Sequence, residues 1–157
     1  AGRGLTRAGF LWVGEEDIAV GRQRKEAILR GLQAGGVTEV RQYLADFTYP
    51  TALSAARDIL RDPGHPEILI CATDRIAYGV YKAARELGLR IPEDISVTGF
   101  GGYETNDLLV PPLTTIRFDV DTQAIVCADT VLRMVQGEPV SKKQLIGYDF
   151  LRGGSVR

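Results

Sequence analysis

The stretch that most constrains the fold runs from Ile68 to Gly102, where one amphipathic segment separates two apolar ones. Residues 68–72 form a continuous apolar run, which is typical of a parallel strand buried on both faces. Apolar residues at helical spacing follow from Thr73-Asp74, and Gly88 supplies a C-terminal stop. Residues 94–100 are extended and apolar again. The stretch therefore predicts a strand, a crossover helix and a parallel strand with a right-handed connection.

The same alternation of strand and helix patterns continues on both sides of this stretch. Further strands are expected at residues 8–13, 37–44, 113–118 and 144–151, and further helices at 19–34, 50–62 and 119–135. The helix at 19–34 has a predicted buried stripe of Val20, Ala27, Ile28 and Gly31. Regular alternation of this kind predicts an α/β fold with an open, doubly wound parallel sheet.

Charge and reactive residues exclude several classes of function. The net charge of −1 lacks the cationic excess of a nucleic-acid-binding surface, so we do not expect the chain itself to bind DNA. Cys71 and Cys127 lie in apolar patterns without metal-type spacing, and we interpret both as reduced core thiols. His65, the only histidine, lies in a turn, so no pairing of nucleophile and base is recognisable. We predict no enzyme activity, no metal, no cofactor and no membrane span.

The carboxyl ends of the expected strands are where an open α/β sheet binds ligands. Residues near these ends are Arg24, Asp46, Phe47, Thr73, Asp74, Gly101 and Gly102. A guanidinium, an aromatic face, short polar groups and bare backbone suit a neutral polyhydroxyl ligand. Arg24 falls within the inner stripe of its helix. The pattern alone leaves open whether it extends to solvent, pairs with a carboxylate or meets a ligand.

Two sequence blocks carry a resemblance to a known family. The residues ATDRIAYGVYKAARELGLRIPEDISVTGF, followed by PPLTTI at 111–116, closely resemble the effector-binding domain of LacI/GalR-family bacterial transcription repressors. The resemblance covers residues 7–157. The segments GFGGYET at 99–105 and IGYDFLRGGSV near the end look most like the sucrose-operon repressor branch.

The resemblance implies a periplasmic-binding-protein-like fold, of which this chain supplies mainly one lobe. Residues 7–117 and 140–157 correspond to the C-terminal lobe, and residues 118–139 to a segment of the other lobe. A DNA-binding headpiece and most of that other lobe would precede the chain, so we expect residues 1–157 to be a fragment. The helix at 119–135 then has an apolar stripe without a cover, and it folds over the sheet, swaps to a neighbour or is poorly ordered.

The resemblance also implies roles for the strand-end residues. Arg24 matches an arginine that grips the effector, Phe47 the aromatic wall of the pocket, and Thr73 a polar position that reaches the ligand. Asp74 lies beside that site and is expected to cap the following helix. Asp46 and Phe118 complete the expected effector site, with Phe118 where the chain crosses between lobes.

Position 101 departs from the family pattern. Many members carry an effector-binding aspartate where this chain has Gly101. Its loss is expected to enlarge the site and to remove an acceptor, so a disaccharide or a sugar phosphate is a plausible effector.

A second surface is expected on the helix that follows Thr73. Tyr78, Tyr81 and Arg85 lie on the face opposite its buried stripe, and the matching family helix forms a dimer interface together with the region of Leu108 and Leu109. We therefore expect an isologous homodimer.

The expected function is a cytoplasmic, ligand-sensing module that reaches operator DNA only through a headpiece outside this chain. Its expected effector is a sugar, namely sucrose, fructose or a sugar phosphate, and no membrane contact is expected. A transport-type sugar-binding protein, which would be secreted and monomeric, is the alternative with the same fold. A nucleotide-dependent enzyme is disfavoured, because the chain has no Walker motif and no G-x-G-x-x-G after its first strand.

Overall fold

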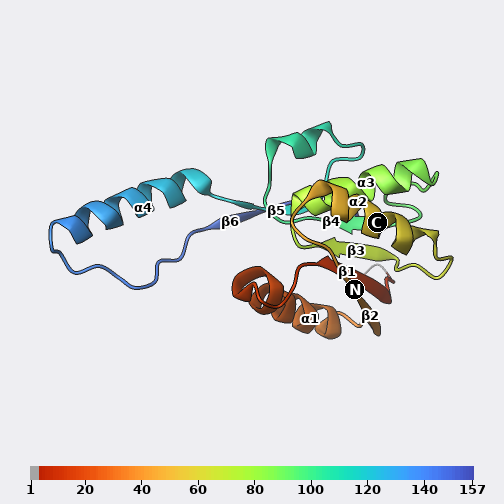
Figure 1. Cartoon of the computed structure of the whole chain (residues 1–157), viewed down its shortest axis with the longest axis horizontal. Coiled ribbons are helices and arrows are strands. Elements are labelled where there is room, and N and C mark those ends of the chain that lie inside the picture. The colour runs from red at the N-terminus through yellow and green to blue at the C-terminus, as the bar shows by residue number, and fades with distance from the viewer. Residues whose placement is uncertain (1–3) are drawn as a thin grey trace.

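The core of the molecule is a parallel sheet with the strand order β2-β1-β3-β4 (Figure 1). The computed structural model describes residues 4–157. The strands are β1 (Arg7–Trp12), β2 (Glu39–Leu44), β3 (Ile68–Cys71) and β4 (Ser96–Thr98). Ala8 pairs with Val40 on one side and with Ile68 on the other, so β1 and β3 are central. Their apolar runs are buried on both faces, and the predicted α/β class with a doubly wound parallel sheet is confirmed.

Helices cover both faces of this sheet. The π-helix η1 (Ile18–Arg24) continues into α1 (Lys25–Ala34), whereas α2 (Tyr49–Arg61) and α3 (Asp74–Glu86) lie on the opposite face (Figure 1). The chain moves from β1 to one neighbour and then across to β3, and right-handed crossovers in opposite directions put the helices on opposite faces.

The first helix differs from its predicted pattern. Lys25 is buried and pairs with Glu15, whereas Ala27 and Gly31 of the predicted buried stripe are exposed. A π-helix closes its hydrogen bonds over five residues instead of four, so it shifts the phase of every residue that follows. A stripe drawn at a constant 3.6-residue period therefore cannot locate the buried face of α1.

Helix starts also differ by small steps from the predicted ones. Thr73, not Asp74, caps α3, because its hydroxyl accepts a hydrogen bond from Ile76 N at 3.4 Å. Asp119 caps α4 (Val120–Val135) by accepting from Thr122 N at 3.0 Å, so the helix starts one residue after the expected position 119.

The last third of the chain leaves the sheet and returns to it. Strands β5 (Thr115–Phe118) and β6 (Tyr148–Leu151) form an antiparallel pair, which carries α4 away from the sheet (Figure 1). No residue of α4 is buried, and its large apolar side chains Val120, Ile125, Val131, Leu132, Met134 and Val135 are all more than half exposed. The uncovered apolar helix agrees with the expected assignment of residues 118–139 to another lobe, which stays a prediction.

Two further expectations are corrected in this region. Cys71 is a buried thiol as predicted, but Cys127 on α4 is exposed, because nothing within residues 4–157 covers that helix. The last strand begins at Tyr148 and not at Gln144. None of the described helices has the length and the hydropathy to cross a membrane.

The chain end is fixed to the edge strand β4. Val97 N donates to the Ser155 carbonyl at 2.8 Å, and the buried Ser155 hydroxyl donates to the Val97 carbonyl at 2.7 Å. Thr114 N in turn donates to the Ser155 hydroxyl oxygen at 2.8 Å. These bonds satisfy the edge of β4 where the next strand of the sheet would otherwise pair.

Close packing between α2 and α3 depends on Gly79. A Cβ at this position would lie 2.7 Å from Leu53 N and 2.9 Å from the Ala52 carbonyl carbon, and backbone atoms cannot move aside cheaply. We expect Gly79→Ala to lower the free energy of unfolding by about 1–3 kcal/mol. The matched control is Gly31→Ala in α1, where a Cβ would meet nothing within 4 Å. It should raise stability by about 0.5–1 kcal/mol, because glycine disfavours a helix. Urea unfolding of both variants measures the contrast, and equal effects would contradict it.

Candidate functional site

The carboxyl edge of the sheet brings several of the predicted ligand residues together. The chain reverses its winding direction between β1 and β3, and ligands of open α/β sheets bind at this switch point. Arg24 follows β1 through η1, Asp46 and Phe47 follow β2, Thr73 follows β3, and Gly101 follows β4. All of these positions therefore lie beyond the same edge of the sheet.

Arg24 is held at the centre of this edge by two contacts. Its Nη1 donates to the Ala72 carbonyl at 2.9 Å, and its Cζ lies 3.6 Å from the centroid of the Phe100 ring. Burial lowers the pKa of the guanidinium, and the charge of Asp17 opposes that shift. Because arginine keeps its proton in proteins, a half-buried cation is left stacked on an aromatic ring. No ion pair of Arg24 occurs among residues 4–157, so pairing with a carboxylate is not what places it there.

Phe100 connects Arg24 to the strand that leaves the sheet. Its ring centroid lies 5.0 Å from that of Phe118, with an interplanar angle of 57°. Phe118 is 38% exposed, so this aromatic row ends at an open surface. Phe100 was not predicted as a site residue. Its place between two glycines at a strand end was the available signal, and it was assigned to the strand alone.

Residues after β2 contribute less to this cluster. Asp46 accepts hydrogen bonds from Thr48 N at 2.7 Å and from the Thr51 hydroxyl, and these bonds lower its pKa. Its carboxylate therefore shapes the turn into α2. Phe47 is 41% exposed, and no ring contact among the described residues joins it to Phe100 or Phe118. Asp46 and Phe47 thus share the edge with Arg24 without touching the Arg24–Phe100–Phe118 row.

Asp74 lies beneath the site and is fully buried. Its Oδ2 accepts from Gly102 N at 2.6 Å, Tyr103 N at 3.2 Å and Asn106 Nδ2 at 2.8 Å. Its Oδ1 accepts from the Thr115 hydroxyl at 2.6 Å. A carboxylate with both oxygens engaged and no exposed surface does not face a ligand. Asp74 therefore supports the loop after β4 from below, and this is why it lies next to the predicted site.

Glycines around the end of β4 allow close contacts with Asp74 and Arg117. A Cβ on Gly99 would lie 2.1 Å from Asp74 Oδ1. Gly102 has a φ of +75°, and a Cβ there would overlap Arg117. At Gly101 the Tyr103 ring and the Asp74 carboxylate lie close to the backbone, and the enlargement of the site stays a prediction.

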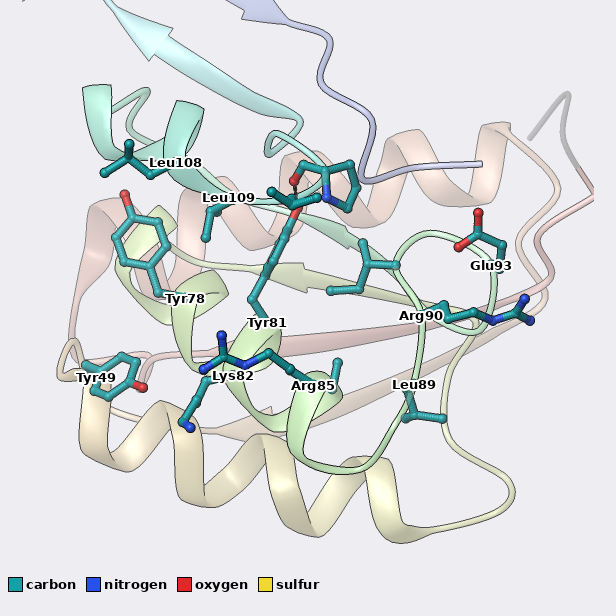
Figure 2. Close-up of a pocket in the computed structure, with 14 residues that line it drawn as sticks. Tyr49, Tyr78, Tyr81, Lys82, Arg85, Leu89, Arg90, Glu93, Leu108 and Leu109 are labelled. Carbon is teal, nitrogen blue, oxygen red and sulfur yellow. Dashed lines mark hydrogen bonds between the residues drawn. The ribbon is translucent and has the colours of Figure 1, made fainter.

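A hollow of about 680 Å³, separate from the strand-end residues, lies over α3 and η2 (Glu104–Leu108) (Figure 2). Tyr81 is only 9% exposed and donates to the Pro111 carbonyl at 2.8 Å; burial raises its pKa to about 12. The half-buried Tyr78 donates to Asn106 Oδ1 at 2.8 Å. The helix face opposite the predicted buried stripe is therefore not exposed at these two tyrosines, because both hydroxyls bind the segment after β4. Arg85 and Leu108 remain exposed at the rim, and Leu109 is half-buried.

Comparisons with known proteins agree with this architecture. The family model "Periplasmic binding protein-like domain" matches residues 1–156. The HTH-type transcriptional repressor CytR of Escherichia coli K12 is 30% identical over 99% of this chain and 46% of its own length. The sucrose operon repressor of Staphylococcus xylosus is 30% identical over 89% and 43%, respectively. The chain thus spans about half the length of the curated relatives it matches.

Solved structures give the same match in three dimensions. The lac repressor dimer bound to operator and the anti-inducer ONPF has a TM-score of 0.87 over 98% of this chain and 53% of its own. At 24% identity this likeness shows the fold alone. A LacI family transcriptional regulator from Arthrobacter sp. FB24, in complex with lactose, has a TM-score of 0.83 at 25% identity, over 98% and 59% of the two chains.

The role of Asp74 gives a stability prediction. Asp74→Ala leaves the donors of Gly102, Asn106 and Thr115 without their acceptor in a buried place. We expect it to lower the free energy of unfolding by about 3–4 kcal/mol. The control is Asp58→Ala on the exposed face of α2, which should leave the unfolding midpoint nearly unchanged. Urea denaturation followed by circular dichroism makes the measurement. Similar losses in both variants would show that Asp74 does not organise the loop.

Proposed function

Because the chain belongs to the family of periplasmic binding protein-like domains, and its homologues are LacI-family repressors, we propose that it is the effector-sensing and dimerisation module of a transcriptional regulator. The observation that carries this proposal is Arg24, held over Phe100 beside Ala72 at the switch point of the sheet. A fixed cation next to aromatic faces binds and orients a ligand without supplying a nucleophile or a base for a reaction.

The effector we propose is a sugar. An aromatic face stacks on the C–H side of a sugar ring, and a guanidinium offers several donors in a fixed plane to its hydroxyl oxygens. Phe118 provides the exposed face and Arg24 the donors, and the half-buried Thr73, which follows the Ala72 carbonyl bonded by Arg24, provides a hydroxyl. The relative named for the sucrose operon and the solved relative with bound lactose agree with this class of ligand.

Signal transmission in this proposal uses the two strands that carry α4. Residues 118–139 would belong to a second lobe, so β5 and β6 would be the crossings between lobes. A ligand seated against Phe118 touches a crossing strand directly. Binding would therefore favour one arrangement of the lobes and, by linkage, change operator binding by a headpiece elsewhere in the protein, in the cytoplasm.

A transport-type sugar-binding protein is the alternative for the same fold. The relatives at 30% identity are repressors, which favours the regulator.

The sugar-sensing proposal is tested at Arg24. In the full-length protein, we expect Arg24→Ala to weaken binding of the effector sugar about 10–100-fold, because a hydrogen bond from a charged group is lost. Arg22→Ala is the matched control, since Arg22 is exposed on the same helix, and it should leave affinity unchanged. Isothermal titration calorimetry with a panel of sugars gives the values. If no sugar binds the wild-type protein, the proposed function fails.

The dimerisation proposal is tested on the rim of the α3 hollow. Leu108 is 81% exposed beside Leu109 and Arg85, and an isologous dimer would cover it. We expect Leu108→Glu to raise the dimer dissociation constant at least ten-fold, whereas Leu145→Glu, at an equally exposed leucine outside the hollow, leaves it unchanged. Analytical ultracentrifugation distinguishes the outcomes. A wild-type protein that stays monomeric at high concentration would refute the interface.

A further inference from the structure

The space beside Gly101 is bordered by the ring of another residue, Tyr103. Its φ of +147° lies in a region that favours glycine, and a Cβ there would lie 3.1 Å from Tyr103 Cε2 and 3.4 Å from Tyr103 Cζ. These two carbons belong to the hydroxyl-bearing end of the Tyr103 ring. The edge of the Tyr103 ring, together with Asp74 Oδ2 at 3.2 Å, therefore lies against the point where a side chain at position 101 would begin.

Tyr103 is fixed at its backbone and free at its side chain. Its N–H donates to the buried Asp74 carboxylate at 3.2 Å, next to the shorter bond from Gly102 N at 2.6 Å. The side chain is 56% exposed, and within residues 4–157 its hydroxyl makes no hydrogen bond. A phenol can both donate and accept, and its ring face can stack on a sugar. The backbone of Tyr103 is thus fixed beside the predicted effector position, and its hydroxyl has no partner within residues 4–157.

A hollow of about 650 Å³ opens beside this ring. Gly101, Gly102, Tyr103 and Phe118 contribute to its wall, so it begins where the Arg24–Phe100–Phe118 row ends. Its size falls within the range of small-molecule sites, about 300–1,000 Å³. The row and the hollow are therefore adjacent, and Phe118 belongs to both.

Charge in the hollow favours a neutral ligand. Arg117 and Arg152 line it, but so do Glu104 and Asp107, and Arg117 is already paired with Asp149 at 2.8 Å. A wall with equal numbers of cations and carboxylates gives no net attraction for a phosphate group in this hollow, as distinct from the neighbouring position at Arg24. It does offer donors and acceptors for several hydroxyls.

We propose that Tyr103 is a specificity-determining residue that selects a neutral disaccharide. One ring of the disaccharide binds at Arg24 and Phe100, and the second lies against Tyr103 and Phe118. The phenol hydroxyl takes over the polar contact that a side chain at position 101 would make. This inference rests on the sugar-sensing function proposed above and names the class of its ligand.

The test uses the full-length protein and isothermal titration calorimetry with sucrose, maltose, D-glucose, D-fructose and glucose 6-phosphate. The wild-type protein should bind one of the disaccharides most tightly. Tyr103→Ala should weaken that disaccharide about ten-fold while the monosaccharide affinities stay unchanged, because only the second ring loses its stacking partner. Tyr103→Phe keeps the ring and should lose about two- to five-fold.

Tyr49→Ala is the matched control, since Tyr49 at the start of α2 is also an exposed tyrosine but does not line this hollow. It should change no affinity, and thermal melts should show all three variants folded. A wild-type preference for a monosaccharide or for the phosphate would overturn the inference and leave sugar sensing intact. An equal loss for one-ring and two-ring sugars in Tyr103→Ala would also overturn it. Absence of binding by every sugar would instead refute the proposed function itself.

Discussion

The buried carboxylate of Asp74 is the interaction on which the arrangement of both surfaces depends. A charge removed from water is tolerated only where hydrogen bonds replace its hydration. No cation pairs with Asp74 among the described residues, so the replacement comes from two backbone N–H groups, an amide and a hydroxyl, with the positive end of the α3 dipole beside them. Each donor comes from the segment after β4 or from β5. One charge therefore fixes where that segment and the crossing strand lie.

Two further residues of α3 bind the same segment after β4. Asp74, Tyr78 and Tyr81 are spaced four and three residues apart, which places them on one side of the helix. They bind in turn the loop at Gly102, the side chain of Asn106 and the carbonyl of Pro111. The segment after β4 thus borders the α3 hollow, shown in Figure 2, and is also held by Asp74 beside the strand-end site. A shift of that segment at either surface would be felt at the other.

Much of the fold could be predicted from the sequence, because central parallel strands must be apolar on both faces. The run at residues 68–72 and the glycine after α3 located a βαβ unit that the structure confirms. Arg24 could be singled out because a cation within an inner stripe requires a partner. What could not be predicted depends on three-dimensional context. The π-helix changes the phase of α1, and Cys127 is apolar in pattern but lies on a helix without a cover.

The two tyrosines of α3 and the aromatic pair at Phe100 show the same limit. Helical spacing places Tyr78 and Tyr81 away from the core stripe, and only the path of the later segment decides whether that face is open. The segment covers it, so the tyrosines bind within the chain. Phe100 and Phe118 are far apart in sequence and meet because β5 continues alongside β4, with Gly101 bridged to Arg117.

The same bridge explains how a bound ligand could act at a distance. Phe118 is both the last residue of a strand that leads to α4 and the neighbour of the ring beneath Arg24. Thr115, three residues earlier, is held by Asp74 and cannot follow a displacement of Phe118 without breaking a buried hydrogen bond. A displacement of Phe118 therefore moves only the part of β5 after Thr115, which leads to α4. In the proposed function, a ligand in contact with this ring would therefore displace the outer part of β5 and leave the sheet in place.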